Sequence, residues 1–159
     1  MKVKVLFVCL GNICRSPLAE AVFKHKIKED NLIDWLEADS CGTANYHIGD
    51  TPDPRTIQNA LRNGVTIDHR GRQLKPADLA HYDIIFAMDE SNYNNIMKLE
   101  RAYKYADKVA MMRTFDPQGP GDVPDPYYGK EKDFQEVFDI LDRTMDNLIN
   151  HLKENRLKA

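Results

Sequence analysis

The chain has 159 residues, of which 42% are hydrophobic and 30% charged, which suits one compact globular domain over residues 1–159. Its formal net charge of −3 argues against nucleic acid or an acidic membrane surface as a partner. Three cysteines without a disulfide-like spacing favour a reducing, cytoplasmic setting, and no apolar stretch approaches the ~18 residues that cross a membrane.

The first elements predicted along the chain are a strand, a helix and a second strand. Residues 3–8 are β-branched and apolar, as is typical of a strand buried on both faces of a parallel sheet. Ser16 fits the N-cap of a helix and Pro17 its first turn, and apolar positions continue this helix to Ile27. Residues 36–41 predict the second strand.

The later segments continue this alternation. A polar loop at residues 42–54 leads to a helix at 54–62, and a buried strand at 82–88 leads to a helix from residue 89 onward. A weaker strand follows at 107–112, then a long loop at 114–133 and an amphipathic helix at 134–152. Such a pattern predicts an α/β domain with a parallel sheet. Ligands bind at the carboxyl ends of the strands of such sheets, which here indicates the loop at residues 9–16. The 114–133 loop is longer than most connections, which also favours a functional role.

The loop CLGNICRS can hold a tetrahedral oxyanion against a sulfur atom. Gly11 permits a positive φ and Asn12 tolerates one, so successive N–H groups can converge on one centre beside a helix N-terminus. Arg15 can close this cradle with a planar fork that matches two phosphate oxygens, and Cys9 would lie at its floor. The helix dipole, the loop amides, the Ser16 hydroxyl and Arg15 together would activate Cys9 as a nucleophile.

Simpler interpretations of the loop stay open on residue types alone. A cysteine that ends a buried strand can be an inert small hydrophobe, and Ser16 can serve as an N-cap and nothing else. A nucleotide P-loop is excluded, because nothing matches Gly-x-x-x-x-Gly-Lys-Ser/Thr. Cys9 and Cys14 lack a convincing second pair of zinc ligands, so we expect no metal and no cofactor.

These residues resemble a known signature. The stretch VCLGNICRSPLAE is similar to the phosphate loop of the low-molecular-weight protein tyrosine phosphatase family, Cys-x-x-x-x-x-Arg-Ser within Cys-x-Gly-Asn-x-Cys-Arg-Ser-Pro. Residues 40–55 resemble its variable pocket loop, 86–92 its third-strand segment and 125–129 its general-acid loop. The resemblance implies a four-stranded parallel sheet with helices on both faces, a flavodoxin-like, Rossmann-type three-layer sandwich.

The resemblance also implies a role for each site residue. Cys9 is similar to the family's nucleophile, Arg15 to its phosphate clamp and Asp125 to its general acid, for hydrolysis through a cysteinyl-phosphate without metal. Ser16 matches the serine that bonds the thiolate, and we expect Cys14 to protect an oxidised Cys9 by forming a disulfide. The phosphate-binding loop comprises Leu10, Gly11, Asn12, Ile13 and Cys14. The residues that match those holding the shape of the loop are Asn12, Ser40 and His69. The residues that match the walls of the substrate cleft are Tyr46, Tyr127 and Tyr128.

Two of these assignments depend on the resemblance. Asp53 and Asp116 also precede proline in polar loops, and each such aspartate can simply initiate a turn, so only the resemblance selects Asp125. Tyr127 and Tyr128 are more often loop packing than substrate walls.

Other functions are possible on the same residues. Arsenate reductases of this fold use further cysteines, but this chain has Cys41 on the second strand and none at residues 80–90. Arginine phosphatases of this fold have Thr where this chain has Ile13. A non-catalytic phosphate-binding module would need no cysteine at the cradle floor and no acid on a second loop. A phosphocysteine carrier would need a docking partner and would not hydrolyse its own phosphocysteine. We expect a monomeric enzyme that acts on phosphotyrosine proteins or small aryl phosphates and releases inorganic phosphate; His47 receives no role.

Overall fold

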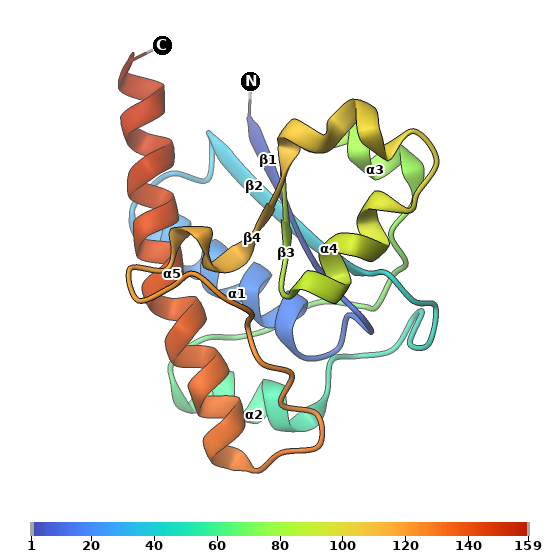
Figure 1. Cartoon of the computed structure of the whole chain (residues 1–159). Coiled ribbons are helices and arrows are strands. Elements are labelled where there is room, and N and C mark those ends of the chain that lie inside the picture. The colour runs from blue at the N-terminus through green and yellow to red at the C-terminus, as the bar shows by residue number, and fades with distance from the viewer. Residues whose placement is uncertain (1, 159) are drawn as a thin grey trace.

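Four parallel strands form the central sheet of the computed structural model, which describes residues 2–158 and the side chains up to residue 156. The strands are β1 Val3–Cys9, β2 Leu36–Gly42, β3 Ile84–Ala87 and β4 Val109–Met111, and they lie in the order β2-β1-β3-β4 (Figure 1). Cys9 pairs with Gly42 and Val8 with Ala87, so the carboxyl ends of β1, β2 and β3 meet at one edge of the sheet.

Helices cover both faces of this sheet, as predicted. They are α1 Arg15–Glu29, α2 Pro54–Arg62, α3 Pro76–His81, α4 Glu90–Met97 and α5 Glu131–Lys158, with short 3₁₀ helices at Ala102–Lys108 and Met112–Phe115. Side chains along β1 alternate between the two faces. Val5 and Phe7 pack into the core with α1 and α5, whereas Leu6 and Val8 pack with α3 and α4.

The C-terminal helix α5 confirms the predicted amphipathic pattern, and Figure 1 shows it running along one side of the sheet. Its apolar positions are buried at Phe134, Val137, Phe138, Leu141, Met145, Leu148, Ile149 and Leu152. Its other faces are polar. In the described range 2–158, no helix combines the length and the apolar character that crossing a bilayer requires.

Two elements differ from the sequence prediction around residues 76–88. The chain forms α3, which the sequence analysis did not predict, and β3 is shorter than the expected strand at 82–88. The N–H of Tyr82 donates to the carbonyl of Asp78, so Tyr82 ends α3 instead of opening the strand. A helix of six residues has too little periodic pattern to be recognised from the sequence.

Candidate active site

The loop between β1 and α1 forms the floor of the site. Asn12 has a φ of 57°, which confirms the predicted left-handed turn, whereas Gly11 lies outside that region. Helix α1 begins at Arg15, with Cys14 at its N-cap, so the prediction of Ser16 as the N-cap is wrong. No side chain of the described chain caps this helix, which leaves its first N–H groups for an anion.

The carbonyl groups at the start of this loop are turned outward. The N–H of Thr43 donates to the Cys9 carbonyl at 2.9 Å, and that of Ala44 donates to the Leu10 carbonyl at 3.0 Å. Carbonyls held in this way leave the loop amides available to a bound anion. Residues 9–10 and 42–44 can approach this closely because residue 42 is glycine: a Cβ at Gly42 would lie 2.7 Å from the Leu10 carbonyl oxygen.

Cys9 lies beneath the loop, 3% exposed, with its Sγ 2.9 Å from Ser16 Oγ. Asn12 Nδ2 donates to the same hydroxyl oxygen at 2.8 Å, so the Ser16 proton is left for Cys9 Sγ or for the Cys41 carbonyl, 3.3 Å away. Ser16 therefore occupies its hydroxyl with the sulfur and with Asn12, which is the physical reason that it does not cap the helix.

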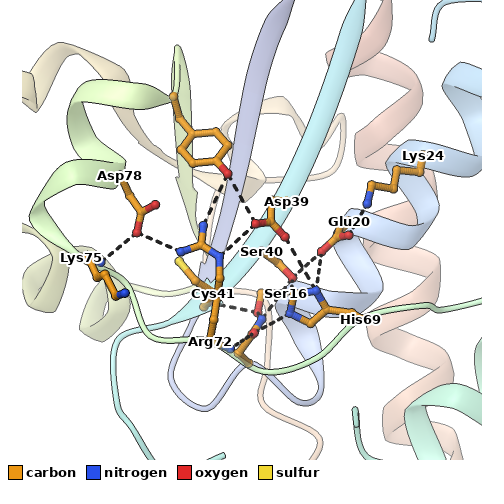
Figure 2. Close-up of polar contacts among 12 residues, drawn as sticks. Ser16, Glu20, Lys24, Asp39, Ser40, Cys41, His69, Arg72, Lys75 and Asp78 are labelled. Carbon is orange, nitrogen blue, oxygen red and sulfur yellow. Dashed lines mark hydrogen bonds and ion pairs between the residues drawn. The ribbon is translucent and has the colours of Figure 1, made fainter. Parts of the chain in front are cut away.

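A buried polar network supports the loop from behind, as Figure 2 shows. Asn12 Nδ2 also donates to Ser40 Oγ at 3.1 Å, and Asn12 Oδ1 accepts from His69 Nε2 at 2.6 Å. The backbone N–H of Arg72 donates to Asn12 Oδ1 at 3.1 Å, and a backbone N–H can only donate, so this contact determines the orientation of the amide. His69 Nδ1 in turn lies 3.1 Å from Glu20 Oε1. The sequence-predicted Ser40 and His69 therefore both contact Asn12.

Three side chains of this network have donor atoms suited to a metal. Atoms of Glu20, Asp39 and His69 lie within 4.8 Å of one another. Each carboxylate already has a cation, since Lys24 Nζ lies 2.5 Å from Glu20 and Arg72 Nε 2.9 Å from Asp39. Burial would raise the pKa of Glu20, but hydrogen bonds, first that from His69, lower it. The protein's own side chains thus balance both charges.

Arg15 is 3% exposed and is held by residues far from it in the sequence. Its Nη1 donates to Asp89 Oδ2 at 2.7 Å and to the Val123 carbonyl at 2.9 Å. Its Nη2 lies 3.7 Å from Asp125 Oδ2. Burial works to lower the pKa of Arg15, but Cys9 and Asp89 raise it, so the guanidinium stays charged. The positively charged guanidinium of Arg15 is therefore held in a fixed position near Cys9 Sγ.

Asp125 lines the same cavity as Cys9 and Arg15. Its side chain is 49% exposed, and its Oδ1 accepts a hydrogen bond from the N–H of Tyr127 at 3.1 Å. A carboxyl group that is open to solvent and faces the cavity can exchange protons with water and with a bound molecule.

The other two Asp-Pro aspartates have structural partners. Asp53 caps α2 by accepting from the N–H of Arg55 at 2.9 Å. Asp116 is held by Arg113 and Arg143, each with a nitrogen 2.8 Å from its carboxylate. Burial would raise the pKa of Asp116, but the bonds from Arg143 and Arg113 help to lower it to about 2. Asp53 and Asp116 are therefore paired with arginines, whereas Asp125 faces the cavity, although residue type alone left the three equivalent.

A cavity of about 290 Å³ opens above Cys9. Besides Cys9, Arg15 and Asp125, its lining contains the predicted Leu10, Gly11, Ile13, Cys14, Tyr46, Tyr127 and Tyr128, and also His47, which received no role. Tyr46 is 69% exposed and Tyr128 97%, so these rings border the mouth, while Tyr127 is 39% exposed.

Sequence reasoning missed Glu20, Gly42, Arg72 and Asp89. Asp89 carries a signal that could have been found, because it follows β3 and parallel strands place their carboxyl ends at one edge. The contacts of Glu20, Gly42 and Arg72 join segments far apart in the sequence, and no local pattern marks them.

Comparisons with known proteins show which family the chain resembles over most of its length. Residues 4–158 match the model of a family described as low molecular weight phosphotyrosine protein phosphatase. A protein of that description from Saccharomyces cerevisiae is 43% identical over 141 residues, which cover 86% of this chain and 87% of the yeast protein. The structure is similar to that of a protein tyrosine phosphatase from Entamoeba histolytica, with 41% identity, a TM-score of 0.92 and coverage of 98% of this chain and 99% of that one. The arginine phosphatase YwlE is also similar, with 25% identity, a TM-score of 0.87 and coverage of 97% and 98%.

Proposed function

The chain belongs to the low molecular weight phosphotyrosine protein phosphatase family and is a cysteine-dependent protein tyrosine phosphatase, and we propose that Cys9, Arg15 and Asp125 carry its chemistry. The observation that carries this proposal is the cavity in which a sulfur, a guanidinium and a carboxyl group meet. In the first step Cys9 sulfur attacks phosphorus, the bond from phosphorus to the tyrosine oxygen breaks, and Asp125 gives that oxygen its proton.

The second step returns the enzyme to its starting state. Asp125, now a carboxylate, takes a proton from water as the water oxygen attacks phosphorus, and the S–P bond of the phosphocysteine breaks. Inorganic phosphate leaves, and Cys9 is again a thiolate. The amides of Leu10 to Cys14 and the fork of Arg15 stabilise the equatorial oxygens in both steps, so the reaction needs no metal.

The residues around the cradle have supporting roles in this proposal. The Ser16 hydroxyl stabilises the Cys9 thiolate, and a contact of 2.9 Å between Sγ and Oγ supports this role. Asn12 adopts an uncommon left-handed conformation, and its hydrogen bonds to Ser40 and His69 hold it there.

The proposed function also bears on the cellular environment, the oligomeric state and the partners of the protein. The three cysteines are free thiols, which the reaction requires of Cys9, and we infer a reducing, cytoplasmic environment. We propose a monomer, because this chain itself supplies the sulfur, the guanidinium and the carboxyl group that the reaction uses. We infer no nucleic-acid or membrane partner, in keeping with the net charge of −3.

We expect phosphotyrosine peptides to be preferred over phosphoserine and phosphoarginine peptides, in the presence of EDTA. Ile13 offers apolar contact to an aryl ring, and Tyr46, Tyr127 and Tyr128 wall a cavity of about 290 Å³. The expected advantage in kcat/KM is about 100-fold or more, because a ring buried between such walls gains contacts that a short side chain cannot make.

The same assay distinguishes the alternative functions. Comparable kcat/KM for phosphoserine would contradict the aromatic pocket, and a preference for phosphoarginine would indicate the activity named for YwlE. Binding without turnover would indicate a module or a carrier. An arsenate reductase is disfavoured because Cys41 is fully buried and packs in the core cluster on the opposite face of the sheet from Cys9.

Peroxide is expected to inactivate the enzyme reversibly through a Cys9–Cys14 disulfide. Hydrogen peroxide oxidises the Cys9 thiolate to a sulfenic acid and releases hydroxide; the Cys14 sulfur then attacks the sulfenic sulfur, forms the S–S bond and releases water. Burial raises the pKa of Cys14 to about 12, so Cys14 attacks as a thiol and its proton leaves in the released water. After dithiothreitol the wild type should recover and Cys14→Ser should not. Equal recovery of the two proteins would rule out this protective role.

A further inference from the structure

We propose that Arg55 is a positioning residue that holds Asp125 in place over the cradle, an inference that rests on the proposed role of Asp125 as the acid. Asp125 belongs to the long loop before α5, and its side chain is 49% exposed. Packing of its own side chain therefore does not determine its position. Besides lying 3.7 Å from Arg15 Nη2, Asp125 accepts a hydrogen bond at Oδ1 from the N–H of Tyr127, and the ring of Tyr127 contacts Arg55.

The guanidinium of Arg55 lies over two aromatic rings. Its central carbon is 5.4 Å from the centroid of the Tyr127 ring and 4.7 Å from that of Phe134, at the start of α5. Both distances are within the range of cation–π attraction. Phe134 is 3% exposed and belongs to the core, so Arg55 attaches the more exposed Tyr127 to a ring that is packed in the core.

Asp53 fixes the orientation of the Arg55 fork. Arg55 Nε donates to Asp53 Oδ1 at 3.1 Å, and its Nη2 donates to Oδ2 at 2.8 Å. A carboxylate that binds both arms restricts rotation of the guanidinium plane, which a single contact would not do. The side chain of Arg55 is 44% exposed, so this pairing, together with the two rings, determines where the fork lies.

The same aspartate is attached to the cradle. The backbone N–H of Asp53 donates to the carbonyl of Ile13 at 2.9 Å. A continuous set of contacts therefore runs from Ile13 through Asp53, Arg55 and Tyr127 to Asp125. The acid loop and the phosphate-binding loop are far apart in the sequence, and this path adds to the contacts of Arg15 with the Val123 carbonyl and Asp125 in giving them a fixed relative position.

Removal of the guanidinium should impair protonation of the leaving group while leaving nucleophilic attack intact. For Arg55→Met we expect about a tenfold lower kcat/KM with phenyl phosphate, whose leaving oxygen needs a proton. We expect a change in kcat/KM of less than about twofold with p-nitrophenyl phosphate, whose leaving group departs with little protonation. Arg62→Met is the matched control, because Arg62 lies on the same helix and pairs with Glu131; both substrates should be unaffected.

Combination with Asp125→Asn tests whether Arg55 acts through the acid. The double variant should be no slower with phenyl phosphate than Asp125→Asn alone, since coupled residues are not additive. Additive losses, or an equal loss with both substrates, would overturn the inference. If Asp125→Asn itself lacks leaving-group dependence, the proposed acid is wrong instead. If Arg55→Met fails to fold, Asp53→Asn is the second variant. Asparagine is still a good N-cap residue, but its neutral amide binds the Arg55 guanidinium less strongly than a carboxylate does. This variant must then show the same leaving-group dependence.

Discussion

Replacement of Cys9 by serine should abolish turnover of a phosphotyrosine peptide while binding of vanadate is retained. A serine hydroxyl is a far weaker nucleophile than a thiolate at neutral pH, and we expect kcat to fall on the order of 10⁴-fold or more. The anion site should persist, because the loop amides and Arg15 do not depend on the sulfur. Steady-state kinetics measure the first effect, and calorimetric titration with vanadate the second.

Cys41→Ala is the control for this variant. Cys41 is fully buried in β2, and its side chain packs with the core on the other face of the sheet. Loss of its sulfur should lower thermal stability through a small cavity but leave kcat per folded molecule unchanged. Full activity of Cys9→Ser would show that another group is the nucleophile, and equal inactivation of the two variants would mean that loss of folding is the cause.

Asp125→Asn should reduce kcat/KM with phenyl phosphate by about 10²–10⁴-fold, the usual contribution of a general acid to expulsion of a basic leaving group. An amide cannot donate a carboxyl proton to the phenolate oxygen. The reduction should shrink with p-nitrophenyl phosphate, so a plot of log kcat/KM against leaving-group pKa should become steeper than that of the wild type. The measurement is kcat/KM for a series of substituted aryl phosphates, because kcat also contains hydrolysis of the phosphocysteine, which is the same for every substrate.

Asp116→Asn provides the comparison for Asp125→Asn. The carboxylate of Asp116 is buried between Arg113 and Arg143, so an amide there should weaken the fold. Its effect on kcat/KM should be the same for every leaving group. If Asp125→Asn shows this same uniform behaviour, the acid lies elsewhere and the assignment to the 114–133 loop is wrong.

The strand-to-helix loop is where local sequence was most informative. A buried strand that ends in Cys9, a residue tolerant of positive φ at Asn12 and an arginine at position 15 predicted a cradle, and these residues do line or form it. The prediction succeeded because a short loop between two regular elements has few conformations, and the residues that select among them lie within the loop itself.

Ser16 shows where such reasoning fails. A serine before proline at the start of a helix is a good N-cap by every local criterion. In the folded protein its hydroxyl is 2.9 Å from Cys9 Sγ and receives a hydrogen bond from Asn12, and the N-cap is Cys14, two residues earlier. The partners of the hydroxyl, including the Cys41 carbonyl, lie outside the helix, and no pattern within the helix indicates them.

The sequence by itself determined the alternation of strands and helices, the amphipathic α5 and the chemical content of the loop from Cys9 to Ser16, because hydrophobic periodicity and loop conformation are local properties. Only the tertiary structure decided that Asp53 and Asp116 are paired with arginines, that Asp89 and the Val123 carbonyl hold Arg15, and that Glu20 and Arg72 support Asn12 through His69 and a backbone N–H. The physical reason is that these contacts join residues separated by long stretches of chain, and their partners are chosen by the order of strands in the sheet and by the burial of charge, not by neighbouring residue types.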